Sequence, residues 1–148
     1  MSKLAVSASS ATILGTCSAA PGLRVDFGHH VLHADAAASP ASFTLADTDQ
    51  SDAVPVPIPA VGALQDQTGY ACGGGDCRLI VIDDVNKKLF EAYNANLSGA
   101  SWSADVLAEW NLTKSYGPNG RGTNCASSDS DGLPVAAGLI GLREARPP

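Results

Sequence analysis

The sequence predicts a mainly-β protein, a single-domain antiparallel sandwich or barrel with an irregular, proline-containing first half. Charged residues make up only 16% of the 148 residues, fewer than amphipathic surface helices usually need. Short apolar segments recur about every ten residues between turn residues, a spacing typical of sandwiches and barrels. We expect residues 1–22 to be an extended segment or a weak leader, and residues 23–148 to form the β-rich domain.

The strongest strand signal lies in the middle of the chain. Residues 78–83 (RLIVID) are apolar and β-branched, and residues 87–93 (KKLFEAY) follow after a tight turn, which predicts a β-hairpin. Residues 108–112 (AEWNL) are expected to form another strand. Residues 133–142 are expected to form a short strand or a loop packed on the core, and residues 103–107 a helical turn.

Three prolines alternate with aliphatic residues in 54–59 (VPVPIP). Proline has no N–H to donate to a neighbouring strand, so this segment is expected to be extended. It is either polyproline-like or the edge of a sheet.

The four cysteines indicate an oxidising compartment. Cys72 and Cys77 flank the sequence GGGD, and glycine tolerates the backbone angles that bring two sulfurs to bonding distance. We therefore expect a Cys72–Cys77 disulfide, which leaves Cys17 to pair with Cys125. Free thiols and a metal site are the alternatives, but four-cysteine zinc sites favour two closely spaced pairs and this chain has one. The prediction is a secreted or extracellular protein, the periplasm included, with no metal and no cofactor.

The charge and hydropathy of the chain limit its partners. The formal net charge is −6 and the isoelectric point about 4.7, so nucleic acid and anionic membrane surfaces are disfavoured. No apolar run approaches the roughly 20 residues that a membrane-spanning helix needs. The partners that remain are polysaccharide, a neighbouring protein subunit or a second copy of the chain.

Four aromatic residues are the candidate ligand-binding residues: Trp102, Trp110, Tyr93 and Tyr116. If their rings lay exposed on one sheet face, they would stack on sugar rings. The alternative is that they pack in the core, as aromatic side chains usually do.

Other polar groups are less specific. Asp83, Glu91 and Glu109 lie on expected neighbouring strands, and paired carboxylates are the groups that cleave glycosidic bonds. The cluster His29, His30 and His33 and the segment 129–132 (DSDG) resemble parts of metal sites, but neither has a complete ligand set. We therefore assign no catalytic residue and no metal ligand from the sequence.

Short motifs in a fixed order extend over most of the chain. They are 23–28 (LRVDFG), 51–52 (SD), 55–59 (PVPIP), 80–83 (IVID), 89–93 (LFEAY), 102–104 (WSA), 110–112 (WNL), 128–129 (SD) and 132–140 (GLPVAAGLI). From about Leu23 to Ile140, this order resembles a group of secreted, β-rich bacterial proteins of unknown function. The resemblance implies secretion and a β-rich fold, and it implies no mechanism.

The chain differs from that group at three places. Arg78 stands where the group tends to have a histidine, and Asn111 where an aspartate is common. The chain also stops at Pro148, before a second histidine-containing strand of the group. If the group were enzymatic through those residues, this chain would be inactive. A domain without its last strand would leave an unpaired sheet edge for a neighbouring chain.

Three functions follow from these observations. The first is a secreted, non-catalytic binding or accessory module for polysaccharide or cell-surface material, which predicts Trp102 or Trp110 exposed on a shallow groove. The second is a structural subunit of an extracellular assembly, in which the N-terminal segment and the proline run lie on a neighbouring chain. The third is a polysaccharide hydrolase or lyase, which predicts that Asp83, Glu91 or Glu109 converge in one cleft.

Overall fold

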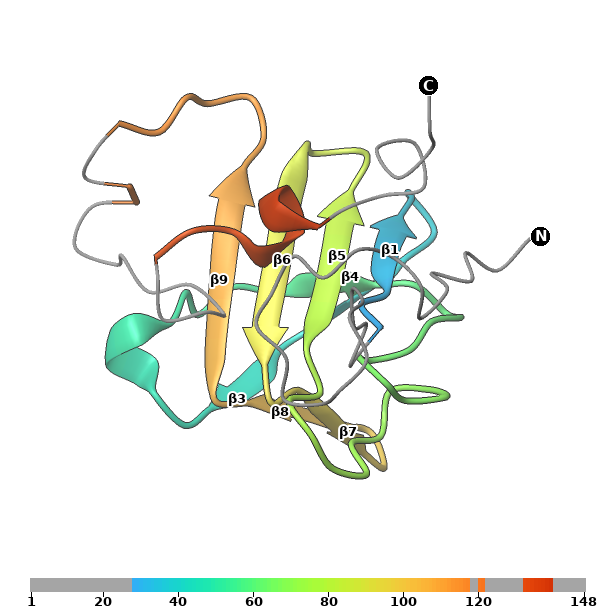
Figure 1. Ribbon diagram of the computed structural model, residues 1–148. Helices are drawn as coiled ribbons and strands as arrows, with labels where there is room; N and C mark the ends of the chain where they lie inside the picture. The colour runs from blue at the N-terminus through green and yellow to red at the C-terminus, as the bar shows by residue number, and fades with distance from the viewer. Residues whose placement is uncertain (1–27, 118–119, 122–131, 140–148) are drawn as a thin grey trace, which may run out of the picture. The chain divides into compact units, whose positions relative to one another are not determined.

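The computed structural model describes residues 28–117, 120–121 and 132–139, and strands make up 37% of these residues (Figure 1). This part of the chain is β-rich, as predicted, and its only helical elements are two 3₁₀ turns. His29–Leu139 forms one compact unit. The predicted boundary at residue 22 lies outside the described residues.

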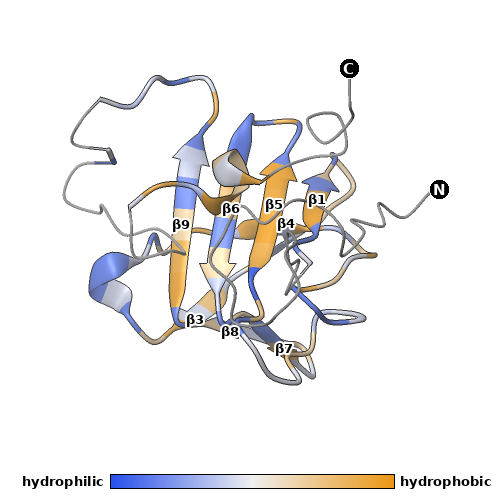
Figure 2. Cartoon of the chain, in the orientation of Figure 1, coloured by the Kyte–Doolittle hydropathy of each residue, from blue (hydrophilic) through white to orange (hydrophobic). Residues whose placement is uncertain are grey.

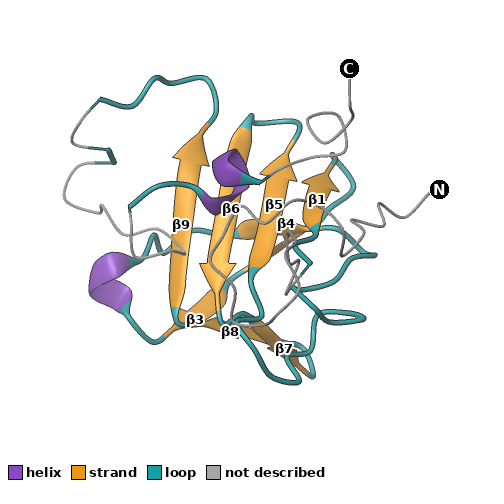
Figure 3. Ribbon diagram, in the orientation of Figure 1, coloured by secondary structure: helices purple, strands orange, loops and turns teal. Residues whose placement is uncertain are grey.

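The largest sheet has four strands in the order β1-β5-β6-β9 (Figure 3). Its strands are β1 (Val31–Ala34), β5 (Leu79–Asp83), β6 (Lys88–Tyr93) and β9 (Val106–Asn111). The predicted hairpin is confirmed as β5 and β6, which pair antiparallel with Val81 opposite Phe90. The predicted strand at 108–112 lies largely within β9, which pairs antiparallel with β6. Strand β1 adds to β5 in parallel, so the sheet is mixed.

The tight turn between β5 and β6 is held by its own residues. The Asp83 carboxylate accepts hydrogen bonds from the backbone N–H groups of Val85 and Asn86, both at 2.9 Å. The Asn86 side chain donates a third, at 2.8 Å. Lys87 adopts a left-handed backbone conformation with φ 55°, which reverses the chain into β6. Side-chain caps of this kind explain why a short polar sequence produces a defined turn.

Two smaller sheets complete the described fold, and neither closes into a barrel. One pairs β2 (Ser39–Ala41) with β4 (Val56–Ile58), and the other has the order β3 (Phe43–Leu45), β8 (Ser101–Ala104), β7 (Asn96–Ser98). The proline run forms β4, which is extended and at a sheet edge, with Pro57 opposite Pro40. Val56 and Ile58, on either side of Pro57, are buried, because their side chains point to the core face of the strand.

The main core lies between one face of the four-stranded sheet and the two smaller sheets. Leu79, Val81 and Phe90 supply it from the large sheet, and Val56 and Trp102 are among its residues from the smaller sheets. Alternation along each strand places these residues on one face.

The opposite face of the four-stranded sheet carries a second apolar cluster of Ile80, Leu89 and Trp110. The 3₁₀ turn η2 (Val135–Gly138) covers this cluster, and the other 3₁₀ turn, η1 (Thr48–Gln50), precedes β4. Figure 1 shows η2 in front of β6. Strand β5 is therefore covered on both faces, which explains its continuous apolar sequence, visible in Figure 2.

Two expectations are settled by these elements. The prediction of a helical turn at 103–107 is wrong. Trp102 and Ala104 are buried, whereas Ser101 and Ser103, which alternate with them, are less buried. This alternation has a period of two, which is typical of a strand. The loop alternative for 133–142 is confirmed in its described part, where η2 packs on the second apolar cluster.

We predict that Trp102→Ala lowers the free energy of unfolding by about 3–5 kcal/mol, because it removes a large side chain from the main core. The Trp102 side chain is only 9% exposed and packs within the main core. Urea unfolding measures the change. The control is Val85→Ala, at a residue that is 56% exposed, with an expected change of about 0.5 kcal/mol or less. Equal effects of the two substitutions would contradict this core assignment.

Candidate functional site

Both predicted binding tryptophans are packing residues in the described fold. Trp102 is 9% exposed and lies between Phe43 and Tyr70, with ring centroids 5.1 and 5.2 Å away. Trp110 is 4% exposed and belongs to the cluster on the opposite sheet face. The groove lined by an exposed indole, which the sugar-binding hypothesis expects, is therefore not formed by either residue. The reason is that burial of an indole removes more apolar surface from water than any other side chain.

The two predicted binding tyrosines are more accessible. Tyr116 is 40% exposed and meets the Trp110 ring edge to face at 5.2 Å. Tyr93 is partly buried, and the Arg78 guanidinium lies over its ring at 5.1 Å. Tyr93 thus already has a cation on its ring, whereas Tyr116 keeps part of its ring open to solvent.

The three candidate catalytic carboxylates do not share a face of the sheet. Glu91 is opposite Ile80 on the face that η2 covers. Glu109 is opposite Phe90, whose side chain lies in the main core, so Glu109 is on the other face. Asp83 belongs to that other face as well, at the far end of β5, where it holds the turn. Glu91 therefore does not converge in one cleft with Asp83 or Glu109, as the hydrolase hypothesis expects.

Glu91 is the most unusual polar residue of the described fold. Its side chain is fully buried, on the sheet face that carries the apolar cluster of Ile80, Leu89 and Trp110. The carboxylate accepts one hydrogen bond from the Val135 N–H at 3.1 Å and another from the Ala136 N–H at 2.8 Å. Both donors are at the start of η2, so this carboxylate ties η2 to β6 across 44 residues of sequence.

Burial raises the pKa of Glu91, because the apolar surroundings disfavour the charged carboxylate. The hydrogen bonds from Ala136 and Val135 oppose this effect, as do Trp110 and the charge of Arg78, but they do not cancel it. The Trp110 indole N–H faces the carboxylate without a well-formed hydrogen bond to it. Glu91 is therefore a buried carboxyl group whose raised pKa favours the protonated form.

A charged cluster surrounds the sheet end next to Glu91. Arg78 is the residue before β5, and its Nε atom lies 3.7 Å from Oδ2 of Asp76. Burial lowers the pKa of His29, and Arg78 lowers it further, while Asp66 and Asp76 act in the opposite direction. Arg78 is thus part of an ionic cluster at the end of the inner strand β5.

The Cys72–Cys77 disulfide is confirmed, with a Cα–Cα distance of 5.7 Å. Cys17 and Cys125 lie outside the described residues. Gly74 and Gly75 adopt positive φ values of 134° and 86°, which is the conformational freedom that the sequence analysis required of this loop.

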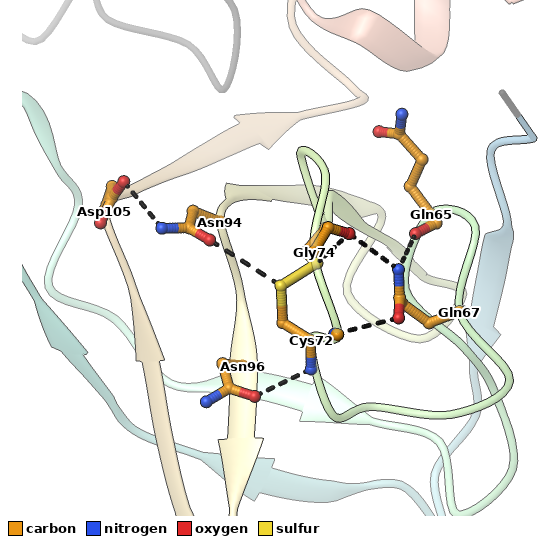
Figure 4. Close-up of a disulfide and its surroundings, with 9 residues drawn as sticks. Gln65, Gln67, Cys72, Gly74, Asn94, Asn96 and Asp105 are labelled. Carbon is orange, nitrogen blue, oxygen red and sulfur yellow. Dashed lines mark hydrogen bonds between the residues drawn. A yellow bond between two sulfur atoms is a disulfide. The ribbon is translucent and has the colours of Figure 1, made fainter. Parts of the chain in front are cut away.

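Amide side chains hold the disulfide loop in place, as Figure 4 shows. Gln67 donates to the carbonyls of Gln65 and Gly74 and accepts from the Gly73 N–H at 3.1 Å. Asn96 accepts from the Cys72 N–H at 2.9 Å. The loop is therefore fixed by hydrogen bonds to its own backbone as well as by the disulfide.

The candidate metal ligands are not gathered into a site. His33 bonds Asp84 through Nδ1 at 3.0 Å, at the exposed end of the sheet. Within 28–117, 120–121 and 132–139, no three His, Cys, Asp or Glu side chains are close enough to hold a metal ion. Residues 129–131 of the calcium-like segment lie outside the described residues.

The outer edge of β9 is covered by hydrogen bonds that the sequence analysis did not foresee. Strand β9 is the last strand of its sheet, so every second residue points its backbone N–H and C=O away from β6. Each of these groups has a partner. The bonds are Leu107 N–H to Ser51 Oγ (3.2 Å), Asp52 N–H to Leu107 O (2.8 Å), Glu109 N–H to Asp52 Oδ2 (2.7 Å), Arg121 Nη1 to Glu109 O (2.9 Å), Asn111 N–H to the Tyr116 hydroxyl (2.7 Å) and Lys114 N–H to Asn111 O (3.2 Å).

An ion pair is at the centre of this sealed edge. Asp52 pairs with Arg121, whose side chain is 6% exposed and whose guanidinium also lies over the Trp110 ring at 5.0 Å. The partners are far apart in sequence: the residue numbers of Asp52 and Arg121 differ by 69, and those of Asp52 and Glu109 by 57. No local sequence signal indicates such a contact, which explains why it was missed.

No protein-family model, no curated protein and no solved structure matches this chain. The resemblance to a group of secreted bacterial proteins therefore remains a prediction, and the site must be interpreted from its own geometry.

We predict that wild-type stability falls, relative to that of Glu91→Gln, as the pH rises from the ordinary glutamate pKa of 4.5 through the raised pKa of Glu91. A carboxyl group whose pKa is higher in the folded than in the unfolded state stabilises the folded protein when it is protonated. This stabilisation is fully present below the unfolded-state pKa, and it is lost as the pH rises through the folded-state pKa. Urea unfolding at a series of pH values measures it. Val85→Ala, which changes no titratable group, should follow the wild-type profile. A wild-type curve parallel to that of Glu91→Gln would contradict the raised pKa.

We predict that Asp52→Ala lowers the free energy of unfolding by about 3 kcal/mol, because it leaves the buried Arg121 without its carboxylate. The substitution also removes the carboxylate that accepts a hydrogen bond from the Glu109 N–H. Urea unfolding provides the measurement, with Asp49→Ala as the matched control. Asp49 is exposed, and its removal should change stability by about 0.5 kcal/mol or less. An Asp52→Ala protein as stable as the control would show that the sealed edge contributes nothing.

Proposed function

We propose that this chain is a secreted, non-catalytic binding or accessory module that acts by contact with another macromolecule. One observation carries the proposal: each candidate catalytic carboxylate is used to hold the fold. Asp83 caps a turn, Glu109 pairs with Lys88 at 2.9 Å, and Glu91 anchors η2. Glycosidic bond cleavage needs two carboxyl groups facing one substrate, about 5–10 Å apart. Glu91 and Glu109 lie on opposite faces of the sheet, which supports a non-catalytic role.

The disulfide supports the extracellular side of the proposal. Cys72–Cys77 closes a loop of small residues and is compatible with an extracellular or periplasmic protein. In the part of the chain that the structure describes, no helix has the length and apolar character to cross a membrane.

A protein partner fits the described surface better than a polysaccharide, because both indoles are buried. Polysaccharide remains a second candidate through Tyr116, whose ring is 40% exposed beside Trp110. Binding by this ring would be lost in Tyr116→Ala and kept in Tyr116→Phe, since the phenyl ring alone supplies the stacking surface. Co-sedimentation with insoluble polysaccharides distinguishes the two variants.

The proposed function predicts that the purified full chain releases no reducing ends and no unsaturated products from a panel of polysaccharides. The assay compares wild type with Glu91→Gln, and it uses Glu109→Gln as a matched control on the opposite sheet face. A release of product that disappears in Glu91→Gln and persists in Glu109→Gln would contradict the proposal and would support the hydrolase hypothesis.

A further inference from the structure

The two edges of the four-stranded sheet differ in their backbone hydrogen bonding. At β9, the outward-facing groups of Leu107, Glu109 and Asn111 are all bonded within the chain. At β1, the Ala34 carbonyl accepts a hydrogen bond from the Asp84 N–H at 3.0 Å, so the backbone N–H and C=O of Ala34 point toward β5. Residues alternate along a parallel ladder, and Val31 and His33 therefore point their N–H and C=O groups outward. No described residue bonds to these groups.

Strand β1 also lacks the features that usually protect an edge. Its sequence, VLHA, contains no lysine and no proline, and its ladder with β5 has no bulge. The small β2–β4 sheet, by contrast, has prolines on both strands. Val31 is 38% exposed and His33 is exposed, so a second strand has access to β1.

We infer that β1 is an interaction edge whose partner is β1 of a second copy of this chain, paired antiparallel about a two-fold axis. The inference rests on the proposed function and names its partner. Centred on Leu32, this register makes Val31 of each copy exchange both backbone hydrogen bonds with His33 of the other. Both outward-facing residues of both strands are then satisfied, which is the self-complementarity that a two-fold interface requires.

The residues beyond the strand ends fit the same register. Asp35 follows β1, and His29 and His30 precede it. Asp35 begins a turn in which its carboxylate accepts the Ala37 N–H at 2.9 Å. Continued one residue beyond β1, the antiparallel register would place Asp35 of one copy opposite His29 of the other and near His30, at both ends of the pairing. A ring N–H of an imidazole donates a hydrogen bond to a carboxylate whether or not the ring is protonated, so these groups are complementary in hydrogen bonding and no like charges meet across the edge.

The sealed edge of β9 determines the size of the assembly. Pairing at β1 creates one continuous sheet with a β9 strand at each end, and each β9 has no free backbone group to add a further strand. The structure therefore favours a dimer over a filament. Because β1 has only four residues, the pairing is short and the dimer is expected to be in equilibrium with the monomer.

Sedimentation velocity of the full chain over a range of concentrations tests the inference. The expected result is a concentration-dependent dimer that His33→Pro weakens by about tenfold or more, since proline removes an N–H that donates across the dimer. His33→Ala is the matched control: it loses the same ring and the contact with Asp84 but keeps the N–H, so its dimer should persist. If His33→Pro does not fold, Val31→Lys places a charge at the same edge and should also weaken the dimer.

Amide hydrogen exchange identifies the edge that is used. Protection of the Val31 and His33 amides should increase with protein concentration, while that of Leu107 and Glu109 should not change. A strict monomer, or a dimer unaffected by both edge variants, would overturn the inference. Product release from polysaccharide would overturn the proposed function instead, so the two failures are distinguishable.

Discussion

Burial of strand β5 on both faces is the constraint on which the rest of the structure depends. One face requires the two smaller sheets, and the other requires η2. The second cover is only a short turn, and it lies above a face that includes the carboxylate of Glu91. A buried carboxylate without donors would cost several kcal/mol, so the backbone N–H groups of η2 are as necessary to Glu91 as Glu91 is to the position of η2.

The same sheet illustrates how a β protein controls its edges. Strand β9 is sealed by Ser51, Asp52, Arg121 and Tyr116, whose polar groups replace the missing neighbouring strand. Ser51 and Asp52 lie between β1 and β5 in the sequence, whereas Tyr116 and Arg121 follow β9. Together they protect the backbone of β9 from further pairing. Strand β1 has no such protection among the described residues. The asymmetry links the fold to the proposed function, because one end of the sheet is closed and the other can accept a partner.

The sequence predicted the parts of the fold that depend on neighbouring residues. The β5–β6 hairpin follows from two apolar runs and a tight polar turn, and the Cys72–Cys77 disulfide follows from a loop of glycines. The proline run is extended, as predicted, and of the two predicted alternatives, a polyproline-like segment or a sheet edge, its residues in β4 form the sheet edge. The segment 103–107 was misjudged, since small and polar residues there disguise a strand whose period is visible only from burial.

The candidate site was much less predictable. Trp102 and Trp110 were recognised as either binding or packing residues, and only the three-dimensional structure places them in two separate cores. The bond from Ala136 to Glu91, the parallel addition of β1 and the Asp52–Arg121 ion pair all join segments distant in sequence. Contacts of this kind carry no local composition or period, so a single sequence does not indicate them.

The most direct test of the account is an NMR titration of the Glu91 side-chain carboxyl together with the backbone amides of Val135 and Ala136. The account predicts that the carboxyl titrates above the ordinary glutamate pKa of 4.5 and that both amide resonances shift with the same midpoint, because they donate to this carboxylate. A carboxyl that titrates at or below 4.5, or amides that do not respond to it, would contradict the structural role assigned to Glu91.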